Sequence, residues 1–133
     1  MKKIIVSGAV IIENGKLLVD KDEHDDFYKI PGGILKEDES LEEACIREAL
    51  EEINANVVII KKLSTLLLDR NPTTKEKMRI ELYHFLCDLE NLSEVKSIHP
   101  IKEAKWLEIE KIKGGKYNVA PNIKFLIEKG EIK

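Results

Sequence analysis

The sequence predicts an α+β fold, an α/β/α sandwich in which one mixed β-sheet carries a helix on each face. Three observations support this prediction. β-rich runs lie on both sides of a central helix signal, an Asn-Gly turn follows the first run, and a second helical pattern lies near the C-terminus. Because 133 residues are enough for one hydrophobic core, we expect a single domain over residues 1–133.

The first part of the chain is expected to be mostly β-structure. Residues 3–12 are rich in β-branched side chains, and Asn14-Gly15 is a preferred pair for a two-residue hairpin turn. We interpret Gly32-Gly33 as a turn in which the missing side chains let a ligand approach the backbone closely. The elements expected here are strands at 3–12, 17–19 and 27–30, with a charged loop at 20–26.

A helix is predicted from Leu41 to Ile53. Ser40 and Glu43 have the spacing of a capping box, in which each side chain accepts a hydrogen bond from a free amide at the helix start. Asn54 follows the helix, and asparagine is second only to glycine in the left-handed conformation that ends many helices. The pattern therefore indicates both ends of this helix.

One face of this helix is acidic. Glu48, Glu51 and Glu52 fall within about a third of its circumference, and Arg47 is placed to pair with Glu51 one turn later. Carboxylates this close repel one another unless a cation binds between them, and hard divalent cations such as Mg²⁺ prefer oxygen ligands. The residues expected to pack on the sheet are Cys45, Ile46, Ala49, Leu50 and Ile53.

The rest of the chain is expected to alternate β-rich runs with polar connections and to finish with helices. Residues 78–89 are the clearest strand, because their side chains alternate in part and are strongly β-forming. The expected elements are a strand at 57–68 broken near 61–62, a polar turn at 70–75, strands at 78–89 and 104–107 joined by a loop at 90–100, and helices at 109–112 and 120–129.

The helix region also carries a longer pattern of fixed spacing, made of Gly33, Glu39, Arg47-Glu48 and Glu51-Glu52. Residues 33–55 therefore resemble the Nudix box of the Nudix hydrolases, written G-x5-E-x7-R-E-U-x-E-E-x-G-U, where U is a bulky apolar residue. Ala49 and Ala55 depart from this pattern at U positions, and Asn54 replaces the final glycine. Asparagine keeps the geometry of the helix end, so the last departure leaves the structural interpretation unchanged.

The resemblance implies the Nudix fold and a hydrolase that cuts a phosphoanhydride bond in a nucleoside diphosphate linked to another group. It also implies Mg²⁺ as the cofactor, with Mn²⁺ as a substitute. The implied metal ligands are Glu48, Glu51, Glu52 and the Gly32 carbonyl. The implied catalytic residues are Glu48, Glu51, Arg47 and Glu39. Of these, Arg47 and Glu39 would orient the metal ligands without binding the metal themselves.

The general base and the substrate contacts stay open. Glu48 and Glu51 are candidates for the general base. The loop that precedes Trp106 offers three more candidates, which are Glu94, His99 and Glu103. Phe27 and Tyr28 are candidates for stacking on a nucleobase, against the alternative that both are core residues.

The composition limits the binding partners and the cellular setting that we expect for this protein. A net charge of -3 argues against a general nucleic-acid binder, and no apolar run approaches membrane-spanning length. The chain start at Met1 lacks a signal-peptide pattern, and Cys45 and Cys87 lie in apolar runs typical of buried free thiols, so we expect a cytosolic setting. The expected protein is a monomer or homodimer.

A small nucleotide is the expected ligand, either a nucleoside triphosphate or a small nucleoside diphosphate derivative. ADP-ribose or a nucleotide sugar is the alternative substrate class. The competing function is a non-catalytic nucleotide sensor or interaction module of the same fold, which would be marked by loss of the carboxylates in the box. All of these carboxylates are present.

Overall fold

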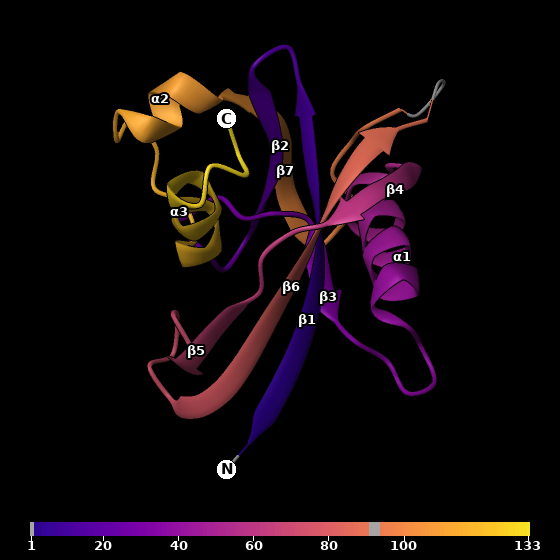
Figure 1. Ribbon diagram of the computed structural model, residues 1–133, viewed down its shortest axis with the longest axis vertical. Coiled ribbons are helices and arrows are strands. Elements are labelled where there is room, and N and C mark those ends of the chain that lie inside the picture. The colour runs from indigo at the N-terminus through magenta and orange to yellow at the C-terminus, as the bar shows by residue number, and fades with distance from the viewer. Residues whose placement is uncertain (1, 91–93) are drawn as a thin grey trace.

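The computed structural model describes residues 2–90 and 94–133, and it contains a seven-stranded mixed sheet with helices on both faces (Figure 1). This confirms the predicted α/β/α arrangement. The elements are β1 (Lys3–Glu13), β2 (Lys16–Asp22), β3 (Gly32–Ile34), α1 (Leu41–Ile53), β4 (Val57–Lys62), β5 (Leu66–Arg70), β6 (Lys77–Leu89), β7 (Ile101–Glu108), α2 (Ile109–Lys113) and α3 (Pro121–Glu128).

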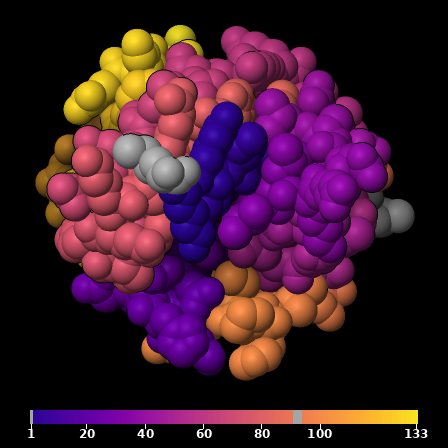
Figure 2. All heavy atoms as spheres, turned by 90° about the horizontal axis from the view of Figure 1, so that it is seen from below, coloured from indigo at the N-terminus to yellow at the C-terminus, as the bar shows by residue number. Residues whose placement is uncertain are grey.

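Strand β1 is the centre of the sheet. It runs parallel to β6 from the pair Lys3–Arg79 to the pair Ile11–Cys87. Its other edge is divided between β3, which pairs with residues 6–8, and β2, which pairs with residues 12 and 13. In the same way β6 pairs with β5 at one end and β4 at the other. Viewed from below, the N-terminal part of β1 lies at the surface between the chain of β5 and β6 and that of β3 and α1 (Figure 2).

Two hydrophobic clusters lie on opposite faces of this sheet. One contains Ile53 of α1 together with Ala9 and Ile11 of β1, and the other contains Val10 of β1 together with Leu126 of α3. Neighbouring residues of β1 enter different clusters because successive side chains of a strand point to opposite faces. Figure 1 shows the consequence, with α1 on one side of the sheet and α2 and α3 on the other.

The predicted turns and strand limits of the first part of the chain need three corrections. The hairpin turn is confirmed, since Asn14 and Gly15 have positive φ angles of 52° and 74°. Strand β2 continues to Asp22, so the charged loop expected at 20–26 begins later. Residues 27–30 form only isolated bridges, and Gly32-Gly33 lies in strand β3 rather than in a turn. The open edge of β1 beside residues 6–8 explains this, because it accepts β3 as a partner.

After α1, the expected long strand is two strands, β4 and β5, which are separated by residues 63–65. Strand β7 begins at Ile101 and is longer than the predicted 104–107. Residues 91–93 of the expected loop at 90–100 lie outside the described residues, and that loop contains a cis peptide between His99 and Pro100. Among the residues described, no helix combines the length and the apolar character needed to span a membrane.

Helix α1 has the predicted ends. Ser40 and Glu43 form the reciprocal capping box, with hydrogen bonds of 3.0 Å to the Glu43 amide and 2.9 Å to the Ser40 amide. Asn54 closes the helix at a φ of 55°, and its side chain donates to the Glu94 carbonyl at 2.9 Å. The buried Ser7 hydroxyl of β1 also donates to the Leu41 carbonyl at 2.7 Å, which fixes the helix start on the sheet.

The predicted sheet-facing side of α1 was partly wrong. Ile46 and Leu50 are exposed, with 42% and 43% of their surface accessible, whereas Cys45 is buried. At about 100° per residue, Leu50 lies about 140° from Cys45 around the helix, while Glu52 lies only about 20° away. The sheet-facing side of α1 therefore includes Glu52 as well as apolar residues.

The left-handed cap leads to a stability prediction. Asn54→Val should lower the free energy of unfolding by ~1 kcal/mol or more, because a β-branched side chain clashes at positive φ. Asn54→Gly is the matched control and should be close to wild type, since glycine adopts this conformation freely but lacks the bond to Glu94. Thermal melts of both variants test this. If the valine variant melts like wild type, the left-handed cap does not exist in solution.

Candidate functional site

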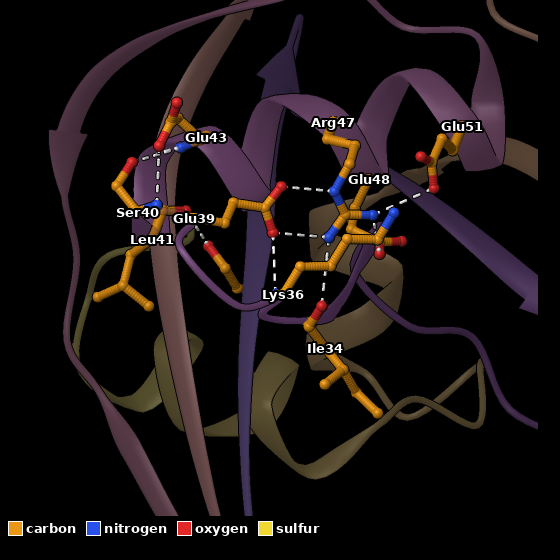
Figure 3. A network of polar contacts seen from close by, with 10 residues as sticks. Ile34, Lys36, Glu39, Ser40, Leu41, Glu43, Arg47, Glu48 and Glu51 are labelled. Atoms are coloured by element: carbon orange, nitrogen blue, oxygen red, sulfur yellow. Dashed lines mark hydrogen bonds and ion pairs between the residues drawn. The ribbon is translucent and has the colours of Figure 1, made fainter.

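Arg47 is at the centre of a polar network on α1 (Figure 3). Its guanidinium donates to both carboxylate oxygens of Glu39, at 2.6 Å from Nε and 2.9 Å from Nη2. Nη2 also donates to the Ile34 carbonyl at 3.2 Å. The bonds from Arg47, together with the Lys36 amide at 3.0 Å, lower the pKa of Glu39 to about 2. Arg47 thus ties the loop before α1 to the helix.

The same guanidinium reaches two further carboxylates. Arg47 Nη1 lies 2.6 Å from Glu48 Oε1 and 3.1 Å from Glu51 Oε2. The predicted pairing of Arg47 with Glu51 is therefore present, but it is one of three. The hydrogen bond to Glu39 is the largest cause that raises the pKa of Arg47. One cation serves three anions, so the group stays negatively charged.

Glu52 has a different environment from the other glutamates of α1. Its Oε1 accepts a hydrogen bond from the Gly32 amide at 2.7 Å, and its Oε2 lies 3.9 Å from the Lys29 ammonium. Only 15% of its side chain is exposed, compared with 54% for Glu51. Burial, and then the charge of the neighbouring Asp20, raise the pKa of Glu52 to about 8. Glu52 thus joins α1 to the start of β3.

The two glycines of β3 provide space rather than unusual backbone angles. A Cβ on Gly33 would collide with the carboxylate of Glu48, and one on Gly32 would lie 2.5 Å from the Ser7 carbonyl oxygen. Neither glycine has a positive φ angle. The missing side chain of Gly33 thus allows α1 to pack closely against β3, and that of Gly32 allows β3 to lie close to β1.

Asp20 is a buried carboxylate that acts on Glu52, and its position was not predicted from the sequence. It was expected at the start of an exposed loop, but it lies on β2 with no accessible surface. Burial raises its pKa to about 7, while Lys29 acts in the opposite direction. A longer strand pattern could have indicated its position, because Asp20 lies two residues after Leu18 and therefore on the same face of the sheet.

The remaining candidates lie in different places. Phe27 lines the cavity described below. Tyr28 does not line it, since its hydroxyl donates to Glu103 at 3.0 Å and its ring packs against that of Tyr117. Glu94 contacts the end of α1 through its backbone carbonyl.

A cavity of about 330 Å³ opens beside Gly32 and Gly33 on the face opposite α1. Phe27 contributes an aromatic wall, and Asn122 of α3 and His84 of β6 contribute polar groups. His84 Nδ1 bonds the Ser64 carbonyl at 2.8 Å, and burial lowers the pKa of this histidine. Because a carbonyl only accepts, Nδ1 carries the proton, and Nε2 accepts from the Asn122 amide at 3.1 Å. The cavity therefore combines apolar walls with a few fixed polar groups.

The carboxylates fit a divalent cation by their chemistry. In residues 2–90 and 94–133, no group of three His, Cys, Asp or Glu side chains is already arranged to hold a metal ion. Arg47 instead holds Glu48 and Glu51. The anions nevertheless outnumber the nearby cations, and Glu48 lies directly against Gly33, where a side chain would exclude it. Hard oxygen donors in excess suit Mg²⁺ or Mn²⁺.

Comparisons with known proteins agree with this architecture. A family model for the NUDIX domain matches residues 2–127, whereas no curated protein matches the chain. The solved NUDIX hydrolase from Nitrosomonas europaea is 20% identical with a TM-score of 0.77, and the alignment covers 96% of this chain and 87% of that one.

Two further solved structures are similar over a smaller share of their own length. A UDP-X diphosphatase is 18% identical with a TM-score of 0.75, over 90% of this chain and 56% of that one. A bifunctional NMN adenylyltransferase/ADP ribose pyrophosphatase from Francisella tularensis, complexed with AMP and a manganese ion, is 23% identical with a TM-score of 0.71, over 96% of this chain and 42% of that one. At these sequence identities, the similarity to the three solved structures shows that this chain shares their fold.

Proposed function

The chain belongs to the NUDIX domain family and is a Nudix-type hydrolase, and we propose that it is a metal-dependent pyrophosphohydrolase acting on a nucleoside diphosphate derivative. One observation carries this proposal. Three glutamates of the box, Glu39, Glu48 and Glu51, gather around a single arginine beside two glycines that border a cavity. The reaction is cleavage of a phosphoanhydride bond by water.

Mg²⁺ is the proposed cofactor, with Mn²⁺ as a substitute. Glu48, Glu51, Glu52 and the Gly32 carbonyl would hold it. When bound, the cation supplies positive charge to the oxygens of the anhydride, where negative charge builds up during cleavage. Glu52 would keep its place through the Gly32 amide, which already donates to its Oε1.

The other residues of the network orient the ligands. Arg47 holds Glu48 and Glu51 on one side and is itself held by both oxygens of Glu39. Glu48 or Glu51 would accept the proton of the attacking water. Of these two, Glu51 has the more exposed side chain. Glu103 is a less suitable base because Tyr28 already donates to one of its oxygens.

The cavity is the proposed site for the nucleoside. Its apolar walls suit a planar base, and Phe27, which lines the cavity, would stack on that base. Gly32 and Gly33 lie between the cavity and the carboxylates, so the phosphates of a bound nucleotide would have to pass around the outer edge of β3 to reach α1. A nucleoside triphosphate or a small nucleoside diphosphate derivative fits this arrangement, and the ADP-ribose and UDP-X activities of the similar structures keep nucleotide sugars as the alternative.

The two thiols support the proposed cytosolic setting. Cys45 and Cys87 are both buried and unlinked, with 3.8 Å between their sulfur atoms. Thiols so close together stay reduced most readily in a reducing compartment.

A nucleotide panel tests the proposed function. The purified protein is incubated with Mg²⁺ or Mn²⁺ and nucleoside triphosphates, ADP-ribose and nucleotide sugars, and release of phosphate, pyrophosphate and nucleoside monophosphate is measured. Metal-dependent turnover of at least one class is expected, and none after chelation. If nucleotides bind without turnover across the whole panel, the protein is a nucleotide sensor instead.

A further inference from the structure

Asp20 is a buried carboxylate on the side of the sheet that carries α1. It lies two residues after Leu18, which belongs to the hydrophobic cluster under α1, so the two side chains share a face. Its backbone is fixed, because its amide and carbonyl both hydrogen-bond to Lys29 at 2.9 Å. The side chain is therefore held beneath the acidic helix.

Both oxygens of this carboxylate lack a hydrogen-bond partner among the described residues, and both are inaccessible to solvent. Buried polar groups are almost always paired, and leaving a charged one unpaired costs several kcal/mol or more. An orphaned buried carboxylate therefore indicates that something cationic belongs beside it.

The cations already present do not meet this need. The positive charge of Lys29 acts on Asp20, but this ammonium also lies 3.9 Å from Glu52 and so serves two anions. Arg47 is engaged by three other carboxylates. The charged groups that act on Asp20 are Glu48 and Glu52 from α1, Asp22 from β2, Asp25 from the following loop, and Lys29. All but the lysine are acidic side chains.

We infer that Asp20 is a further carboxylate of the cation site, supplied by β2 and facing Glu48 and Glu52 from the sheet. This inference rests on the proposed metal-dependent function and extends it to a residue outside the box. Asp20 would add a negative charge that attracts a divalent cation, and the cation would satisfy its unpaired oxygens. The metal-free protein would then carry an electrostatic strain that metal binding relieves.

Asp20→Asn tests this inference, because the change removes the charge and keeps the shape. Mn²⁺ alone is titrated into the full-length protein without nucleotide, and binding is followed by electron paramagnetic resonance. Melting temperatures are measured in chelator and in Mn²⁺. The variant should melt at a higher temperature than wild type in chelator, bind Mn²⁺ at least ~10-fold more weakly, and gain less stability from Mn²⁺.

Two further variants complete the experiment. Asp88→Asn makes the same change at an exposed strand position and should leave both readouts unchanged. Asp20→Ser is measured in parallel, so that a folding defect specific to asparagine does not decide the result.

The outcomes separate this inference from the proposed function. If both Asp20 variants bind Mn²⁺ like wild type, or if both are less stable in chelator, Asp20 is a structural acid and the inference is overturned while hydrolysis stands. If wild type neither binds Mn²⁺ nor turns over any nucleotide, the proposed function itself fails.

Discussion

Glu52→Gln should reduce metal-dependent turnover by more than ~100-fold, because replacing residues that merely orient metal ligands already costs 10–100-fold. The fold should survive. In wild type the Gly32 amide donates to Glu52 Oε1 at 2.7 Å, and the side-chain oxygen of glutamine can accept the same hydrogen bond. Steady-state kinetics at saturating Mg²⁺ measure the loss. Glu42→Gln, an exposed change in the first turn of α1, is the matched control and should retain full activity.

Stability separates this loss of activity from unfolding. An acid whose pKa is raised on folding destabilises the native state as pH rises from its unfolded value to its folded value, here from 4.5 to about 8 for Glu52. Without metal, wild type should therefore lose stability relative to Glu52→Gln over this range, and the two should converge below pH 4.5. A variant that is inactive but at least as stable as wild type at pH 8 supports a direct role. Near wild-type turnover would show that Glu52 does not hold the cation.

Arg47→Ala should lower turnover by roughly 10–100-fold. In our proposal the arginine does not contact the substrate but orients the carboxylates, which would become disordered without it. Three glutamates lose their shared cation in this variant. Arg47→Lys should restore only part of the activity, since an ammonium lacks the planar fork that holds both oxygens of Glu39. Complete restoration by lysine would mean that charge balance alone is sufficient.

The acid stability of Arg47→Ala gives an independent measurement. Because Glu39 has its pKa lowered to about 2 by Arg47, it stabilises wild type above pH 4.5, and this contribution is lost as pH falls from 4.5 toward 2. Arg47→Ala lacks the contribution at every pH. The difference in melting temperature between the two proteins should therefore be largest near neutral pH and shrink below pH 4.

The features predicted correctly depend on local chemistry. The capping box at Ser40 and the left-handed Asn54 fix the ends of α1 through residues close in sequence, and the Asn14-Gly15 turn is equally local. The strong helix pattern also placed Glu51 within reach of Arg47, whereas the contact of Arg47 with Glu48 was not predicted. Such signals are complete within a short window of sequence.

The features missed depend on pairing between distant segments. Gly32 and Gly33 belong to a strand because β1 offers a free edge there, which the glycines themselves do not indicate. Asp20 became buried because β2 continues along β7 as far as Asp22. The inward position of Glu52 was overlooked because Glu52 was grouped with Glu48 and Glu51 on a face separate from the sheet-facing residues, although helix geometry places it beside Cys45.

The parallel pairing of β1 with β6 also decides when the central sheet can be completed during synthesis. Residues 3–11 pair with residues 79–87, and contacts between such distant segments form late in folding. Helix α1 has its own capping signals and can begin to form as soon as it leaves the ribosome, but β3 needs β1 to be in place. The acidic helix and the glycine strand both precede β6 in the chain, so β1 has an unpaired edge along residues 3–11 until β6 has been made.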